Sequence, residues 1–141
     1  ELYQLLMSDV QAFNDWRVLN ADLRIDFDNY DFSEKTLTDA VLINVSLRNA
    51  NFSGASIEYT SFCHSDATGA NFQRVNAGGA HFGSIENSDV RLPQSFLAHL
   101  SHAAILDASD FTEADLEMAN FRNCPRNNAC FESANIEAVV W

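Results

Sequence analysis

Histidine and cysteine side chains are the residues of this 141-residue chain whose types and spacing could support metal or nucleophilic chemistry. His99 and His102 form an HxxH pair, but no glutamate or cysteine follows at a distance that would complete a zinc site. Cys63 and His64 are sequence neighbours, so in extended backbone they point to opposite faces, and no third residue orients the histidine. We therefore predict no metal, no cofactor and no catalytic residues.

The number and spacing of the cysteines indicate reduced thiols in a reducing compartment. Cys63, Cys124 and Cys130 are odd in number and form no CxxC pair, which argues against a disulfide framework and against a zinc cage.

No run approaches the roughly 18 to 20 apolar residues of a membrane span. A hydrophobic content of 47% is that of a folded chain, and the length fits one domain. We expect a single cytoplasmic domain without a membrane segment.

The charge of the chain restricts its partners. Twenty acidic residues against eight basic ones give a net charge of −12. Coulomb repulsion disfavours direct binding to nucleic acid phosphates or to an anionic membrane surface. The charge predicts a protein partner with a basic surface.

A five-residue repeat organises most of the chain. Large apolar residues recur every five positions from Phe27 and, one residue out of phase, again from Leu106. These core-ladder residues are Phe27, Phe32, Leu37, Leu42, Leu47, Phe52, Ile57, Phe62, Phe72, Phe82, Leu106, Phe111, Leu116, Phe121, Phe131 and Ile136. Small side chains such as Ala50 and Ala70 lie two residues before most of them. Helices and strands, with periods of 3.6 and 2, do not explain a period of five.

A chain that turns a corner every five residues does explain this period. Four quintets make a square coil of about twenty residues, so residues twenty apart stack above one another. We predict one interior column of Phe52, Phe72 and Leu92 and another of Phe62 and Phe82. An interior filled with phenylalanine leaves no cleft in which a carboxylate pair could be desolvated for acid catalysis, so we do not expect an enzyme.

The repeat also resembles a known family. The tripeptides Ala-Asn-Phe at 50–52, 70–72 and 119–121 and Ala-Asp-Leu at 114–116 are similar to the A(D/N)LXX motif of pentapeptide-repeat proteins. The resemblance covers about residues 25–136 and implies an all-β fold, a right-handed quadrilateral β-helix, here with about six coils. Asn87, Ser101 and Arg126 depart from the pattern at core positions.

Two segments lie outside the regular repeat. Residues 1–19 have apolar side chains at roughly helical spacing and are expected to form an N-terminal capping helix, similar to that of many bacterial members. Such a helix would shield the apolar end and the free strand edge of the solenoid, 20–141. Between 87 and 105 the register breaks near Pro93, and a bulge, a deletion or a small projecting loop would each produce the break.

The acidic residues suggest where a partner binds. The later coils carry candidate partner contacts at Asp107, Asp110, Glu113, Asp115, Glu117 and Glu137. Asp110 and Asp115 precede the central residue of their quintets, where a short Asx side chain also bonds neighbouring backbone in a turn. At the end of the chain Val139, Val140 and Trp141 form a candidate end-to-end interface for a homodimer, and Trp141 folding over the last coil is the alternative.

These observations predict a non-enzymatic protein-interaction or scaffold module that presents an acidic solenoid surface. The family resemblance implies an alternative, a DNA-mimicking modulator of a type II topoisomerase such as gyrase, as in the members that confer quinolone resistance. A mimic of duplex DNA needs a continuous acidic strip along one or two faces, and this requirement distinguishes the two functions.

Overall fold

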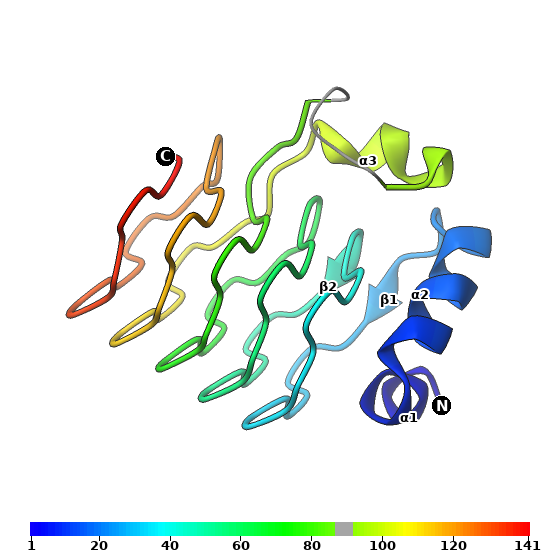
Figure 1. Ribbon diagram of the computed structural model, residues 1–141, viewed down its shortest axis with the longest axis horizontal. Coiled ribbons are helices and arrows are strands. Elements are labelled where there is room, and N and C mark those ends of the chain that lie inside the picture. The colour runs from blue at the N-terminus through cyan, green and yellow to red at the C-terminus, as the bar shows by residue number, and fades with distance from the viewer. Residues whose placement is uncertain (87–91) are drawn as a thin grey trace.

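The repeats form stacked coils in the computed structural model, which describes residues 1–86 and 92–141 (Figure 1). Strand β1 (Ile25–Asp26) pairs in parallel with β2 (Val45–Ser46), so that Ile25 lies opposite Val45. Single-residue bridges continue this pairing along the stack, for example between Asn51 and Asn71. Residues twenty apart therefore lie above one another, as the five-residue period predicts with four quintets in a coil.

Each quintet ends in a tight turn. Ala40 donates its amide hydrogen to the carbonyl of Leu37 at 2.9 Å, and the residue between them, Asp39, has a φ of 65°. Positive φ at the third residue is the mark of a type II turn, a position that favours glycine. Gly54, Gly69 and Gly79 hold this position in three turns, but most turns place a residue with a side chain there. The sequence pattern alone does not reveal this strain.

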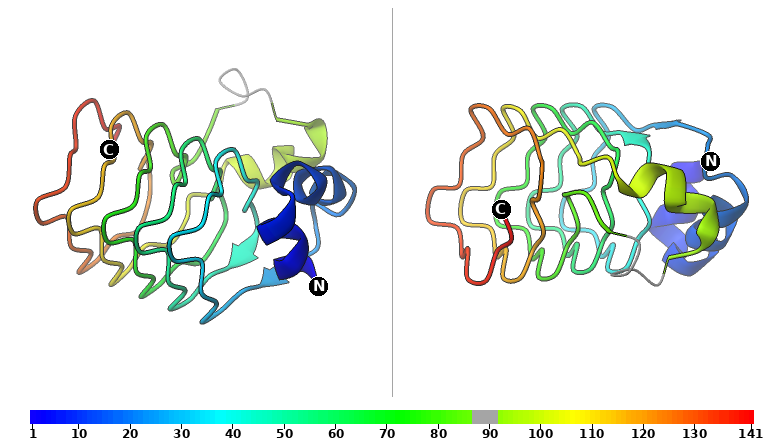
Figure 2. Two further views of the ribbon diagram at one scale, coloured as in Figure 1. Left: turned by 60° about the horizontal axis from the view of Figure 1, so that its bottom comes forward. Right: turned by 90° about the horizontal axis from the view of Figure 1, so that it is seen from above.

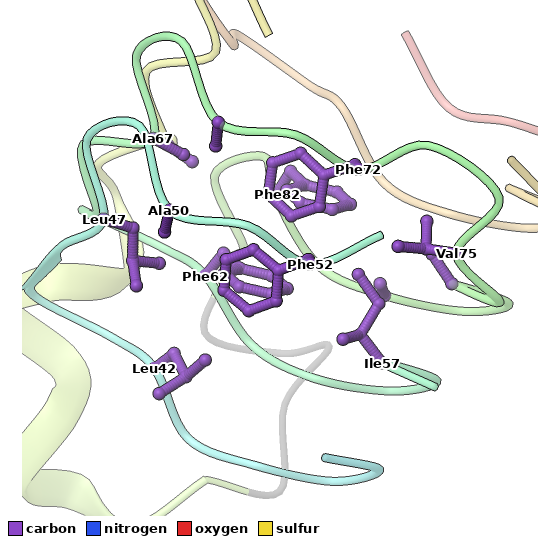
Figure 3. Close-up of a cluster of buried hydrophobic side chains, with 14 of the residues drawn as sticks. Leu42, Leu47, Ala50, Phe52, Ile57, Phe62, Ala67, Phe72, Val75 and Phe82 are labelled. Atoms are coloured by element: carbon purple, nitrogen blue, oxygen red, sulfur yellow. The ribbon is translucent and has the colours of Figure 1, made fainter. Parts of the chain in front are cut away.

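Two columns of stacked aromatic rings fill the interior (Figure 3). Phe72 stacks on Phe52 and on Phe111 with ring centroids 4.9 and 4.7 Å apart and interplanar angles of 8° and 3°. Phe62 stacks on Phe82 at 4.8 Å in the second column. Rings of the two columns meet edge to face, an arrangement that aromatic pairs prefer.

The structure places Phe111, and not Leu92, above Phe72. Leu92 is half-buried in a separate apolar cluster outside the columns, so the predicted stacking of Leu92 is wrong. Among the ladder residues Phe131 is half-buried and Ile136 is 48% exposed, because no described coil covers them. The other ladder residues are buried.

Phe111 lies above Phe72 because the chain has an insertion at one corner of the stack. The bridge offset rises from twenty residues (Ser61 with His81) to thirty-nine (His81 with Asn120), so the chain between these two coils is nineteen residues longer than a regular coil. Ala104 donates to the carbonyl of Phe82 at 2.7 Å, the bond that closes an ordinary corner. The two residues of a normal corner are thus replaced by an insertion, whose described residues, 83–86 and 92–103, are here called the inserted turn. Asn87 lies outside the described residues, and Ser101 is exposed outside the coils.

The inserted turn folds back along the solenoid toward its N-terminal end (Figure 2). It contains the short helices η2 (Gln94–Phe96) and α3 (Leu97–Leu100). Phe96 and Leu100 are buried in a second apolar cluster, against outward-facing side chains of the coils: Val41, Ile43 and Cys63. This cover explains why one face of the solenoid carries apolar residues at outward positions.

Two helices cover the first coil, where the spacing predicted a single helix over residues 1–19. α1 (Leu2–Ser8) and α2 (Val10–Leu19) are separated by Asp9, whose extended backbone ends one helix and whose side chain caps the next through the amide of Ala12 at 3.0 Å. Leu6 and Phe13 are buried in the main core. No helix among the described residues has the length and apolarity to cross a membrane.

Side chains of α2 also satisfy the open strand edge. Asn14 donates to the carbonyl of Asp39 at 3.0 Å and accepts from the amide of Val41 at 2.9 Å. Arg17 is buried and donates to the carbonyls of Asn20 and Ile43. Burial lowers the pKa of Arg17 to about 10, against an opposing effect of Asp22. The edge is thus covered by side-chain hydrogen bonds as well as by apolar packing.

Candidate functional site

Many Asx side chains at the quintet positions have a structural role. Asp31 accepts a hydrogen bond from the amide of Ser33 at 2.9 Å, and bonds from Ser33 hold the pKa of Asp31 below its usual value. The same bond, from the amide two residues on, recurs at Asp26, Asn51, Asp66, Asn71, Asn76, Asp110, Asp115, Asn120 and Asn135. The predicted bonding of short Asx side chains to neighbouring backbone in a turn is confirmed.

Three of the six candidate partner contacts, Asp107, Asp110 and Asp115, accept hydrogen bonds that stabilise the fold. Partial burial would raise the pKa of Asp110, but hydrogen bonds from Thr112 and Gln73 hold it below its usual value. Asp115 accepts from the side chain of Asn135 at 3.0 Å, and Asp107 accepts from the amide of Asn127 at 2.8 Å.

The three glutamates of the set are different. Glu113, Glu117 and Glu137 are exposed, and their carboxylates make no hydrogen bond or ion pair within the described residues. Their charges are free to meet a partner.

A surface groove of about 470 Å³ lies next to Glu117. Its lining residues are Glu58, Tyr59, Asn76, Gly78, Gly79, His81, Asp115, Glu117 and Met118. Tyr59 and Met118 are 61% and 66% exposed, both at positions of positive φ. Sequence reasoning proposed two of its three acids, Asp115 and Glu117, as partner contacts but missed Glu58 and the groove. The groove did have a signal in the sequence, the Gly78–Gly79 pair. This pair lies at outward positions between two corners that carry long side chains.

A histidine cluster joins the inserted turn to the coils. The Nδ1 atoms of His64 and His99 share a hydrogen bond at 3.0 Å, and His99 Nε2 lies 2.9 Å from Asp22 Oδ1. The His102 ring stacks on His64 with centroids 4.3 Å apart. Burial, then His102, His99 and Arg24, lower the pKa of His64. HxxH spacing thus serves contacts within the protein, and no three metal-ligand side chains in the described residues converge on one point.

Cys63 and Cys124 are buried and do not form a reactive site. Burial raises the pKa of both Cys63 and Cys124 to about 12, so neither is a thiolate at neutral pH. The Cys63 thiol donates to the carbonyl of Gly83 at 3.3 Å in the cluster beneath the inserted turn. Its neighbour His64 bonds to His99 and not to the thiol.

The candidate end-to-end residues close the second aromatic column. Trp141 stacks on Phe121 with centroids 5.4 Å apart, and the guanidinium of Arg126, a predicted core position, is exposed and lies 5.1 Å from the Trp141 ring. Val139 packs half-buried on the core, whereas Val140 and Trp141 are 41% and 48% exposed. Pairing of two chains through this surface stays a prediction.

Comparison with known proteins places these features in a family. The family model of pentapeptide repeats matches eight copies over residues 23–58, 46–83 and 98–124, more than half of the chain. A pentapeptide repeat protein from the Arabidopsis thaliana thylakoid lumen is 28% identical with a TM-score of 0.56, over 82% of this chain and 63% of its own. The chain therefore spans less than two thirds of that protein. No curated protein matches the sequence.

Two further solved structures are more distant. A pentapeptide repeat protein from the cyanobacterium Cyanothece is 15% identical with a TM-score of 0.36, over 92% of this chain and 94% of its own. QnrB1, a plasmid-mediated fluoroquinolone resistance protein, is 16% identical with a TM-score of 0.23, over 79% of this chain and 62% of its own. The family match falls on the stacked aromatic columns, and it shows that this chain belongs to the pentapeptide-repeat family of β-helix solenoids.

Proposed function

We propose that the chain is a non-enzymatic interaction module whose acidic solenoid surface binds a protein partner with a basic surface. The observation that carries this proposal is the set of exposed carboxylates, Glu113, Glu117 and Glu137, that make no bond within the described residues. The stacked rings fill the interior, so the chemistry of the chain lies on its surface. A rigid stack holds those charges at fixed spacing, which gives specificity and fast association.

The alternative is a DNA-mimicking modulator of gyrase. It requires an acidic strip that continues from coil to coil. In this chain the outward columns are interrupted. One of them reads Glu34, Gly54, Arg74, Glu113 and Ser133, and another reads Asp28, Arg48, Thr68, Asp107 and Asn127. The interruptions favour a protein partner that recognises local groups of charge over a mimic of the regular phosphate ladder.

The proposal extends to the handedness of the solenoid, its number of coils and the location of the protein. We propose that the solenoid is a right-handed quadrilateral β-helix of about six coils, because parallel strands joined by crossovers are right-handed in nearly all cases. We also propose a cytoplasmic location, which fits three cysteines without a disulfide.

The test of this function measures binding of short blocked peptides of Gly and Ser that carry either Arg or Glu. We expect the basic peptide to bind, with an affinity that falls as ionic strength rises, and the acidic peptide not to bind. The double variant Glu113→Gln/Glu137→Gln should weaken binding. The matched control, Glu1→Gln/Asp15→Asn, removes the same charge from the helical segment and should leave binding unchanged. Equal binding of both peptides would contradict the proposal.

A parallel assay addresses the alternative. DNA gyrase supercoiling is measured with this protein in excess, with and without a quinolone, at two salt concentrations. We expect no effect. Salt-sensitive inhibition or protection would replace the proposed function with DNA mimicry.

A further inference from the structure

The groove beside Glu117 arises because two side chains are missing from one corner. Three successive coils present Glu58–Tyr59, Gly78–Gly79 and Glu117–Met118 at the same corner. Tyr59 donates its amide hydrogen to the carbonyl of Gly78 at 3.1 Å, and Gly79 donates to the carbonyl of Glu117 at 2.9 Å. The outer two corners are thus two strand spacings apart, about 10 Å. The glycines form the floor between them.

The walls of this glycine groove are apolar and aromatic. Tyr59 leans over Gly79, where an added Cβ would come within 2.5 Å of its ring. Met118 borders the groove on the neighbouring coil. Both side chains are more than half exposed, and Met and aromatic surfaces contact flat groups well.

The charge of the groove has one sign. Glu58, Asp115 and Glu117 line it, and neither lysine nor arginine is among its lining residues. Its one basic side chain is His81, whose Nδ1 is buried without a hydrogen-bond partner in the described residues. Burial lowers the pKa of His81, so the ring is neutral at pH 7 and does not repel a cation.

We propose that the glycine groove binds the guanidinium group of an arginine side chain from a basic segment of a partner protein. The planar cation stacks on Tyr59, while the carboxylates of Glu58 and Glu117 accept its hydrogen bonds. Lysine fits less well, because its ammonium is a compact and strongly hydrated point charge. The inference rests on the proposed function and gives it a defined site.

The experiment uses the Gly/Ser/Arg peptide and two analogues in which arginine is replaced by lysine or by uncharged citrulline. Amide chemical shifts of the ¹⁵N-labelled protein report the site, since Gly78 and Gly79 lie in the floor. We expect saturable shifts at these two amides with the arginine peptide, weaker binding with lysine and no saturation with citrulline.

Two variants test the groove itself. Gly78→Leu fills it at low folding cost, because the φ of Gly78 is not in the left-handed region and a Cβ there meets no atom closer than 3.8 Å. We expect this variant to weaken binding about tenfold. Glu117→Gln should weaken it about threefold, as for an exposed ion pair. The control is Glu132→Gln, which removes the same charge from an exposed position outside the groove and should have no effect.

Each remaining outcome is informative. If the arginine peptide binds but Gly78→Leu binds it as well as the native protein, or Glu132→Gln weakens binding as much as Glu117→Gln, the groove is not the site and the acidic surface acts as a whole. That result overturns the inference and leaves the proposed function standing. If no basic peptide binds at any salt concentration, both fail. A folded spectrum of each variant validates the comparison.

Discussion

At the scale of single residues, Phe72 illustrates how the interior is held together. It is fully buried and stacked on both sides by Phe52 and Phe111. We expect Phe72→Ala to lower the free energy of unfolding by about 3 to 5 kcal/mol, measured by urea denaturation, because it leaves a cavity between two fixed rings. Phe131→Ala, at a half-buried ring, should cost less. A loss below about 1 kcal/mol for Phe72→Ala would contradict the stacked-column description.

A second prediction at this scale concerns the turns. Ala108 is exposed and has a φ of 58°, a conformation that disfavours any residue with a Cβ. We expect Ala108→Gly to raise the free energy of unfolding by about 1 kcal/mol in spite of the added chain entropy. Ala70→Gly, at a buried position without positive φ, should lower it. If both variants were destabilised equally, relief of strain would not be the cause.

At the scale of elements, the sequence predicts the regular coils well and their exceptions poorly. A period of five fixes which residues face inward, and the burial of Phe32, Phe62 and Phe121 follows from it. The path of the inserted turn depends on contacts with residues far away in the sequence. A local signal did exist, since Val41, Ile43 and Cys63 are apolar at outward positions and require a cover.

The N-terminal cap and the groove were likewise predicted only in part from the sequence. Helical spacing indicated a cap over residues 1–19, but it did not show that the extended backbone of Asp9 divides it into two helices. The acids of the groove were visible in the sequence. Its concave shape was not, because it depends on which coils lie next to Gly78, and the inserted turn changes that neighbour.

A prediction at this scale concerns the packing of the inserted turn on the coils. Phe96 of the inserted turn is fully buried against the coils, in a cluster separate from the aromatic columns. We expect Phe96→Ala to loosen α3 locally, so that hydrogen exchange of its amides accelerates while that of the Phe72 amide, bonded to the next coil, is unchanged. Faster exchange throughout the stack would mean that the inserted turn is required for the whole solenoid.

At the scale of the whole molecule, the histidine cluster ties three distant segments together. Asp22 and Arg24 come from the approach to the first coil, His64 from a corner, and His99 and His102 from the inserted turn. One shared hydrogen bond between His64 and His99 requires that one of the two facing nitrogens carry no proton. The cluster is therefore compatible with at most one added proton on this pair.

The pH dependence of stability follows from this cluster and from His81. Burial lowers the pKa of both His64 and His81 in the folded state, so the unfolded chain binds more protons below about pH 6.5. The free energy of unfolding should fall as the pH is lowered from about 7.5 to about 5.5. Urea denaturation across this range measures it, and His64→Gln should reduce the slope. A slope that stays the same in His64→Gln and vanishes in His81→Gln would assign the effect to His81 alone. In that case the cluster joins the three segments without responding to pH.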